Sequence, residues 1–467
     1  MNNNTNYAIK NKFFTFIFFL FLFLSIINTL FQYINFDKYS TPKNKEPRHQ
    51  LINGDIGYFW REGNDLTQDL LNGENYFQIG EEYRRPYLPS KLFAIYSFLA
   101  SEKLIDENDK VIIGGKKLFF LIFQSVIFYS LLLFLYKELL NFFPKFTSQI
   151  CILFLAIEPT IFMYHSSFWS ESIFFSLLLV FIILILRNDY SYKKLFLLGI
   201  VLGILYLQRS VAIFYIFSLL IYLFFNNKKL FLKSFCFVTI GYFLVHLFVG
   251  YHNYTRTGIF YSTSTQAKDG FYIYLAPLIL SKNLKISEKE AFKKLDQKKY
   301  DWANENKINL NLEQERLLFY NYQQKEALKI LIKNPVNSLF IIAEKSLHFF
   351  VIDPLTHVYY FHRWNYENGY FYESKEHNKW IIPRIFYSIF IYFFCFLGFV
   401  FLYKKKDSKH LLLFLSLSIF YFIVVQSWYG GTRYFSPILI FLSFLFANGF
   451  SYFVKKINFF NQKKIKN

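Results

Sequence analysis

The chain has 467 residues, of which 54% are hydrophobic and 23% aromatic, and its apolar residues come in long blocks. This excludes a soluble multidomain protein, because runs of about 20 apolar residues cross a bilayer as helices. The net charge of +20 does not indicate nucleic-acid binding, because Lys and Arg gather at the ends of apolar runs and no nucleic-acid recognition motif accompanies them.

Apolar blocks in chain order predict an all-α, polytopic membrane protein with about ten transmembrane helices. The first run follows Lys10 and Lys12, exceeds the length of a signal-peptide core and lacks a small-residue cleavage site, so we expect it to be an uncleaved span. The expected spans are 13–34, 117–137, 147–165, 170–187, 194–208, 211–226, 231–250, 381–402, 410–428 and 434–454.

Basic clusters in the short connections predict the orientation. With ten spans, all of these clusters fall on one side, which the positive-inside rule makes cytoplasmic. The N- and C-termini are then cytoplasmic, and two large hydrophilic segments, 36–116 and 251–380, lie on the exterior side. The clusters are Lys10 and Lys12, Lys137 and Lys145, Arg187 with Lys193 and Lys194, Lys228 and Lys229, Lys404 to Lys406, and the C-terminal lysines from Lys455 onward.

The exterior segments carry predicted helices of their own. In the first, 65–71 is expected to form a short helix, Pro86–Pro89 an extended turn, and 91–104 an interfacial helix. In the second, 312–333 is expected to form a helix of mixed charge. The apolar stretch 336–352 has charged residues at its middle, which are costly in hydrocarbon, so we expect an amphipathic interfacial helix. No internal repeat occurs, and we treat 1–467 as one membrane domain.

An acidic residue stands in the first exterior segment, within Gly54-Asp55-Ile56-Gly57-Tyr58. A carboxylate near the membrane interface can accept a proton from a hydroxyl nucleophile, as a general base does. The same residue between glycines can also cap local backbone groups in a turn. The pattern leaves both roles open for Asp55.

Other charges can be placed at the same exterior face. Arg84 and Arg85 lie in the first exterior segment, Glu171 begins a span, Arg209 lies between two spans, and Arg433 precedes the last span. Guanidinium groups suit phosphate because their planar fork donates two parallel hydrogen bonds. The alternatives are helix capping for the glutamate and contacts with ordinary lipid headgroups for the arginines.

Common soluble-enzyme motifs are missing from the sequence. It contains no GxGxxG, P-loop or GxSxG motif, and its histidines show no metal-ligand spacing. The three cysteines are widely spaced and support neither a zinc site nor a disulfide framework. A nucleotide-driven pump and a soluble-type hydrolase are therefore disfavoured, and no metal-ligand set is predicted.

Taken in order, several segments resemble the GT-C class of polyprenyl-phosphate-sugar glycosyltransferases, in particular the bacterial glycosyltransferase family 39-like proteins. The resemblance covers most of the chain. The segments are the loop around Asp55, Arg85-Pro86-Tyr87-Leu88-Pro89, Ser170-Glu171, Gln208-Arg209, Asn253 to Phe260, the exterior helices around Asn334-Pro335, and Arg433-Tyr434.

The resemblance implies an inverting hexosyl- or pentosyltransferase in the cell (inner) membrane, with its active site facing the exterior (periplasmic) side. It moves a sugar from a polyprenyl-phosphate carrier to a hydroxyl of a lipid, glycan or protein acceptor. By the same resemblance, Asp55 is the general base. Arg84, Arg85, Arg209 and Arg433 hold the carrier phosphate, whereas Tyr58, Glu171, Asn253 and Tyr434 shape the cleft.

Some properties stay open at this stage. Protein O-mannosyltransferases of this class carry adjacent Asp-Glu in the first loop, whereas Ile56 follows Asp55 here, which argues against protein mannosylation. A divalent cation is a possible cofactor, although one carboxylate is a poor site for it. Alternatives are an O-antigen polymerase or ligase using Arg256, His357, His362 and Arg363, or a transporter, which the missing repeat disfavours.

Overall fold

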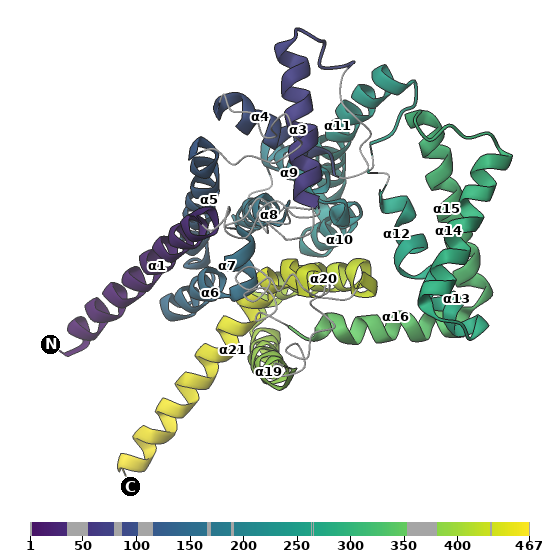
Figure 1. The fold of residues 1–467 in the computed structure, drawn as a ribbon. Coiled ribbons are helices and arrows are strands. Elements are labelled where there is room, and N and C mark those ends of the chain that lie inside the picture. Colours follow the sequence, from purple (N-terminus) through teal and green to yellow (C-terminus); the bar gives the residue numbers. More distant parts are fainter. Residues whose placement is uncertain are drawn as a thin grey trace.

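The computed structural model describes residues 2–34, 55–78, 86–100, 115–165, 170–187, 191–262, 264, 266–352, 381–429 and 432–466. The elements in these ranges are helical (Figure 1). They are α1 (Asn2–Ile34), α3 (Asp55–Leu71), α4 (Tyr87–Ala100), α5 (Gly115–Leu139), α6 (Lys145–Ile157), α7 (Pro159–His165), α8 (Ser170–Leu186), α9 (Tyr192–Gln208), η1 (Ser210–Ala212), α10 (Tyr215–Asn226), η2 (Lys228–Leu230), α11 (Phe231–Thr257), α12 (Gln266–Tyr274), α13 (Ala276–Leu284), α14 (Glu288–Glu305), α15 (Glu313–Lys333), α16 (Pro335–Phe350), α19 (Ile381–Lys404), η5 (Lys406–Ser408), α20 (Lys409–Gln426), η6 (Ser427–Tyr429) and α21 (Thr432–Lys466).

The predicted helical membrane fold is confirmed. All ten predicted spans coincide with helices, and the third is divided into α6 and α7, which meet at an angle of 58° before Pro159. Within the described ranges, five helices are long and apolar enough to cross a membrane, or six if the bent pair counts as one span. Large apolar side chains point outward from them, among them Leu232 and Phe396, as lipid contact requires. The protein is therefore a multi-pass membrane protein, and its number of crossings stays a prediction.

Two local expectations about the first exterior segment are wrong. The helix expected over 65–71 begins ten residues earlier, at Asp55. The extended turn expected over Pro86–Pro89 is instead the start of α4, with Pro89 as the third residue of that helix. A proline fits there because the first-turn N–H groups have no partner within the helix.

Close helix packing depends on glycines that face one another. In the pair α19–α21, a Cβ on Gly398 would overlap the carbonyl oxygen of Leu445, and a Cβ on Gly449 would overlap that of Phe394. The pair α9–α11 uses Gly199 in the same way, against Val238. Small residues let helix backbones approach in a membrane, where dispersion contacts replace the hydrophobic effect as the driving force.

Helices α12 to α15 belong to the segment predicted to be exterior and form a unit beside the bundle (the exterior unit), seen to the right in Figure 1. Ser287 and Glu290 begin α14 with a reciprocal capping box, and Trp302 stacks on Tyr322 of α15 with ring centroids 4.2 Å apart. Helix α15 confirms the helix predicted over 312–333. Helix α16 runs from this unit back to the bundle (Figure 1), where it packs on η6 and α21.

Helix α16 has one exposed apolar face. Val336, Leu339 and Leu347 are each at least 70% exposed, whereas Glu344 binds Lys282 of α13 through a 3.0 Å ion pair. Residues 339 and 344 point to sides of the helix that are about 140° apart, at 100° per residue. This is the pattern of a helix that lies in a membrane interface, and that placement stays a prediction.

Replacing Gly398 with Ala is expected to destabilise the protein by about 1–3 kcal/mol, because the new methyl group would overlap backbone atoms of α21. Thermal unfolding in detergent measures this. Helix propensity alone would have the opposite effect, because in a helix interior Ala is more stable than Gly by about 1 kcal/mol. A loss of stability therefore indicates overlap with α21, whereas a gain would indicate that helix propensity dominates. Phe396→Leu, at a 65% exposed position of the same helix, serves as the control and should leave the unfolding temperature nearly unchanged.

Spin labels are expected to distinguish the two sides of α16 in proteoliposomes. A nitroxide at position 339 should be more accessible to oxygen, which concentrates in lipid, whereas one at position 344 should be more accessible to a water-soluble nickel complex. Equal accessibility to the nickel complex at both positions would show that α16 lies in water.

Candidate functional site

A buried ion pair joins two of the predicted site residues. Glu171 lies in the first turn of α8, and Arg209 follows the end of α9 in an extended conformation. Arg209 Nη1 lies 3.3 Å from Glu171 Oε1, and the two side chains are 8% and 0% exposed. The Arg209 guanidinium also lies over the Phe174 ring, 5.5 Å from its centroid. Two charges 38 positions apart in sequence therefore meet at one end of the bundle.

Neighbouring polar groups hold this pair in place. Ser170 Oγ donates a 3.1 Å hydrogen bond to Glu171 Oε2, and Gln208 Nε2 donates to the Ser170 carbonyl oxygen at 2.9 Å. The start of α8 and the end of α9 are thereby joined next to the ion pair. Arg209 Nη1 makes the charge contact with Glu171 but no well-aligned hydrogen bond to a described residue.

The end of α20 is attached to the turn that follows Arg209. Tyr421 Oη donates to the Val211 carbonyl oxygen at 2.5 Å and accepts a 3.1 Å hydrogen bond from Phe214 N. Helix α20 then leads through η6 into α21, whose second residue is Arg433. The start of α21 is therefore held near the same end of the bundle. Tyr434 is half-buried there and packs on the main core.

Helix α3, which begins at Asp55, packs on the bundle through α4. Phe59, one turn after Asp55, is 2% exposed, and its ring stacks on Phe93 of α4. Glu62 accepts a 2.5 Å hydrogen bond from Ser90 Oγ, and α4 in turn packs on α9. The backbone that carries Asp55 is thus connected through α4 to α9, the helix that ends just before Arg209.

Several predicted site residues fall outside what the structure describes. Arg84 and Arg85 lie outside the described residues, as do the side chains of Asp55, Tyr58 and Arg433. The same holds for His357, His362 and Arg363, which were predicted for the alternative function as an O-antigen polymerase or ligase. Their predicted roles stay predictions.

A second polar cluster connects α11 to α15. The guanidinium of Arg256 donates to both carboxylate oxygens of Glu313, one of them at 2.7 Å, and Nη2 also donates to Tyr261 Oη at 3.1 Å. Tyr261 Oη donates to the same carboxylate. The Arg256 and Glu313 side chains are 7% and 12% exposed. Sequence reasoning missed this pair, although Arg256 lies in a segment that carries the family resemblance.

Asn253 is held by this cluster. Its Nδ2 donates to the Tyr261 carbonyl oxygen at 2.6 Å, and its Oδ1 accepts a 3.4 Å hydrogen bond from Arg256 Nη2. The chain reverses just after α11, at Gly258, whose φ of +74° favours glycine. This reversal brings Ser262 back along α11 to His246, and Ser262 Oγ and His246 Nδ1 share a 2.9 Å hydrogen bond.

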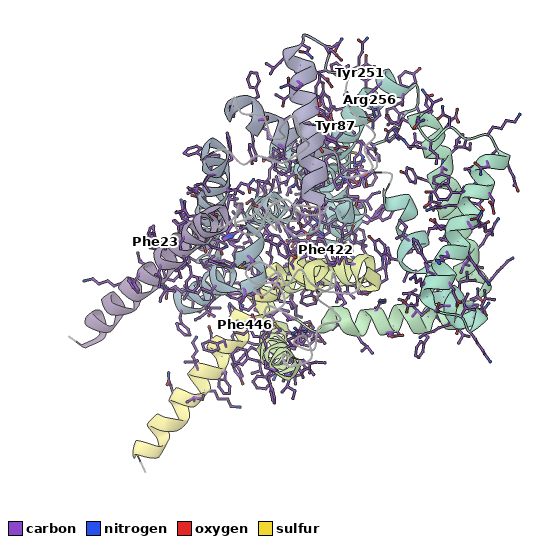
Figure 2. The ribbon with its side chains drawn as sticks, viewed as in Figure 1. Phe23, Tyr87, Tyr251, Arg256, Phe422 and Phe446 are labelled. Carbon is purple, nitrogen blue, oxygen red and sulfur yellow. The ribbon has the colours of Figure 1, made fainter. Side chains whose placement is uncertain are left out.

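Aromatic residues of the first exterior segment pack on the end of α11, near Arg256 (Figure 2). The Tyr76 and His252 rings stack at 4.8 Å, and Tyr87 lies edge-on to His252 at 5.9 Å. Lys91 Nζ lies 5.2 Å from the Tyr87 ring centroid. Burial lowers the pKa of Lys91 to about 8, against the opposing effect of Glu62, which raises it.

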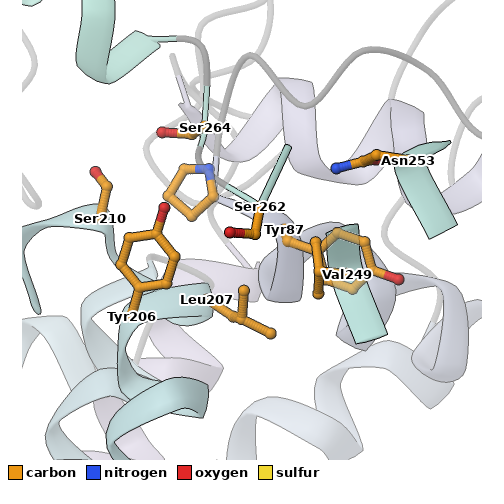
Figure 3. Close-up of a pocket in the computed structure, with 9 residues that line it drawn as sticks. Tyr87, Tyr206, Leu207, Ser210, Val249, Asn253, Ser262 and Ser264 are labelled. Atoms are coloured by element: carbon orange, nitrogen blue, oxygen red, sulfur yellow. The ribbon is translucent and has the colours of Figure 1, made fainter. Parts of the chain in front are cut away.

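These elements enclose a small pocket (Figure 3). Its walls come from the start of α4, the end of α9, η1, α11 and the loop after Gly258. The segment that carries Arg209 contributes three lining residues, and Asn253 is also part of the wall. The lining residues are Pro86, Tyr87, Tyr206, Leu207, Ser210, Val249, Asn253, Ser262 and Ser264.

A metal site is not evident within the described ranges, because no group of three or more His, Cys, Asp or Glu side chains there could hold a metal ion. The possible divalent cation therefore gains no ligand set from these residues.

No family model matches the chain, and no curated protein matches it. Among solved structures, the fold is similar to that of the Archaeoglobus fulgidus oligosaccharyltransferase in its apo form, with a TM-score of 0.48 and 12% identity over 96% of this chain and 52% of that chain. The archaeal oligosaccharyltransferase AglB from Archaeoglobus fulgidus, in complex with an inhibitory peptide and a dolichol-phosphate, gives a TM-score of 0.49 and 13% identity over 96% of this chain and 52% of that chain. This chain spans about half the length of those proteins.

Breaking the ion pair from either side is expected to destabilise the bundle. Glu171→Ala and Arg209→Ala should each cost about 3 kcal/mol, because each leaves the other charge buried without its partner. The double variant should cost less than the sum of the two. Thermal unfolding of the four proteins in detergent measures the coupling, and additive losses would show that the two charges do not stabilise one another.

Proposed function

We propose that this protein is a membrane glycosyltransferase of the GT-C type that transfers a sugar from a polyprenyl-phosphate carrier to an acceptor hydroxyl at the exterior face. One observation carries the proposal. The buried Arg209, paired with Glu171, belongs to the segment Tyr206–Ser210, three residues of which line a small pocket. A guanidinium group is suited to binding phosphate, and its place next to a pocket with serine hydroxyl groups supports a phosphate-linked sugar as the donor.

The orientation follows from the positive-inside rule, which places both termini in the cytoplasm. Both ends of the chain lie on the same side of the molecule in Figure 1, which supports this topology. The pocket is then exterior, and the donor arrives already activated and already across the membrane. This accounts for a sequence without a nucleotide-binding motif.

In the proposed reaction, the acceptor oxygen forms a bond to the anomeric carbon while the bond from that carbon to the phosphate oxygen breaks. Asp55 accepts the proton of the acceptor hydroxyl as general base. The leaving group is the polyprenyl phosphate, whose negative charge Arg209 and Arg433 stabilise, together with Arg84 and Arg85. Attack opposite to the leaving group inverts the anomeric configuration.

Glu171 has a supporting role in this proposal. Its carboxylate fixes the position of the Arg209 guanidinium and offsets the cost of burying that cation when no donor is bound. The guanidinium is thereby held in place before a phosphate binds. Tyr58, Asn253 and Tyr434 shape the cleft around the reacting groups.

Asp55→Asn is expected to lower glycosyl transfer by at least about 100-fold, because an amide cannot accept the proton of the acceptor. The assay uses the full chain in proteoliposomes, a set of radiolabelled polyprenyl-phosphate sugars, and membrane lipids and glycans as acceptors. Asp69→Asn, on the same helix α3, is the matched control and should keep activity.

Two results would contradict this proposal. The first is no transfer from any carrier-linked sugar by correctly inserted protein. The second is an active Asp55→Asn variant together with an inactive Arg363→Ala variant, which would favour the polymerase or ligase alternative.

A further inference from the structure

A tryptophan that precedes the last helix of the bundle packs into the exterior unit. Trp428 lies in η6, which follows α20 and precedes α21. Its indole ring stacks on Phe271 of α12, with ring centroids 4.5 Å apart and an angle of 24° between the rings. Trp428 also packs on an apolar cluster whose buried members are Leu275, Ile279 and Ile341. The chain is thereby anchored, just before α21, in a hydrophobic cluster built by the exterior helices.

Helix α16 also holds the first turn of α21. Its last two residues, Phe349 and Phe350, contact the ring of Phe435, with ring centroids 5.2 Å and 6.4 Å apart. Phe349 and Phe435 are both buried. The same helix supplies Ile341 to the cluster around Trp428. One helix therefore contacts the chain on both sides of position 433.

Arg433 lies between these two anchors. It is the second residue of α21, five positions after Trp428 and two before Phe435. The other candidate phosphate ligand that the structure locates, Arg209, is held within the bundle by Glu171. The backbone at Arg433 is instead held from both sides by exterior helices, so the spacing of the two arginines depends on how these helices pack on the bundle.

We propose that Trp428 is a positioning residue, which sets the start of α21 so that Arg433 and Arg209 bind the same carrier phosphate. This inference rests on the proposed function, in which both arginines bind that phosphate. Hydrogen bonds weaken steeply as their angle departs from linearity, and a misplacement of about 1 Å can cost about 100-fold in rate. The indole ring acts through the backbone of η6 and α21, and the exterior unit thereby takes part in carrier binding.

The test measures binding of radiolabelled, sugar-free polyprenyl phosphate to the full chain in detergent micelles. Trp428→Ala should weaken binding at least about tenfold, which is the loss expected when one charge-assisted hydrogen bond is misaligned. Trp428→Phe should bind nearly as well as the native chain. It keeps an aromatic ring against Phe271 and loses only the 2.8 Å hydrogen bond from Trp428 Nε1 to the Val425 carbonyl oxygen.

A double-mutant cycle separates positioning from general destabilisation. If Trp428 acts through Arg433, Trp428→Ala should have no further effect on affinity once Arg433→Ala is present, to within about twofold. Trp302→Ala is the matched control, since Trp302 stacks on Tyr322 inside the exterior unit and should leave the affinity unchanged. If Trp428→Ala does not fold in detergent, Trp428→Leu, which keeps an apolar side chain in the cluster, takes its place in the cycle.

The outcomes separate this inference from the proposed function. Native affinity in Trp428→Ala, an equal loss in Trp302→Ala, or an undiminished effect of Trp428→Ala beside Arg433→Ala would overturn the positioning role alone. Native affinity in Arg433→Ala would overturn the phosphate-binding role of Arg433, and the positioning role with it. Absence of transfer from every carrier-linked sugar would overturn the proposed function. A loss that Trp428→Phe restores and Arg433→Ala abolishes would support the positioning role by binding alone.

Discussion

The arrangement of the helix ends around the candidate site depends on the free-energy cost of burying charged side chains. An ionised side chain in an apolar surrounding loses its hydration, and a partner of opposite charge must compensate. Arg209 meets Glu171, and Arg256 meets Glu313, in both cases with side chains that are nearly or fully buried. Each pair joins helix ends that are separate in sequence, so these electrostatic contacts also fix where the pocket walls stand.

Helix packing sets the distance between two of those walls. Gly199 and Gly203 let α9 approach α11 so closely that a side chain at either position would overlap Val238 or Val245. Further along α11, a Cβ on Gly250 would overlap the ring of Phe260. The returning loop can therefore lie flat on α11, and it carries Ser262 to His246. Backbone spacing and the position of the polar groups thus depend on the same few glycines.

The spans were predictable because about 20 consecutive apolar residues have few other stable arrangements. The packing of these spans was harder to predict, because the glycines at a close helix contact, such as Gly398 and Gly449, are distant in sequence. The Arg256–Glu313 contact joins residues 57 positions apart in segments without a shared motif, so nothing in the sequence pairs them. Glu171 and Arg209 could be placed at one face from topology alone, whereas their contact required coordinates. The error at Pro89 arose because a proline signals an extended turn and a first helical turn equally well.

The exterior unit contacts the bundle near the pocket and also near η6, where Phe271 of α12 stacks on Trp428. Glu313 and Gln314 begin α15, and Gln314 Nε2 donates to the Thr257 carbonyl oxygen at 2.5 Å, next to the Arg256 contact. At the other end, α16 returns to η6 and α21. Arg256 also donates to Asn253 Oδ1 at 3.4 Å, so its guanidinium contacts both the start of α15 and a residue of the pocket wall. The exterior helices and the pocket wall are thereby joined by one arginine side chain.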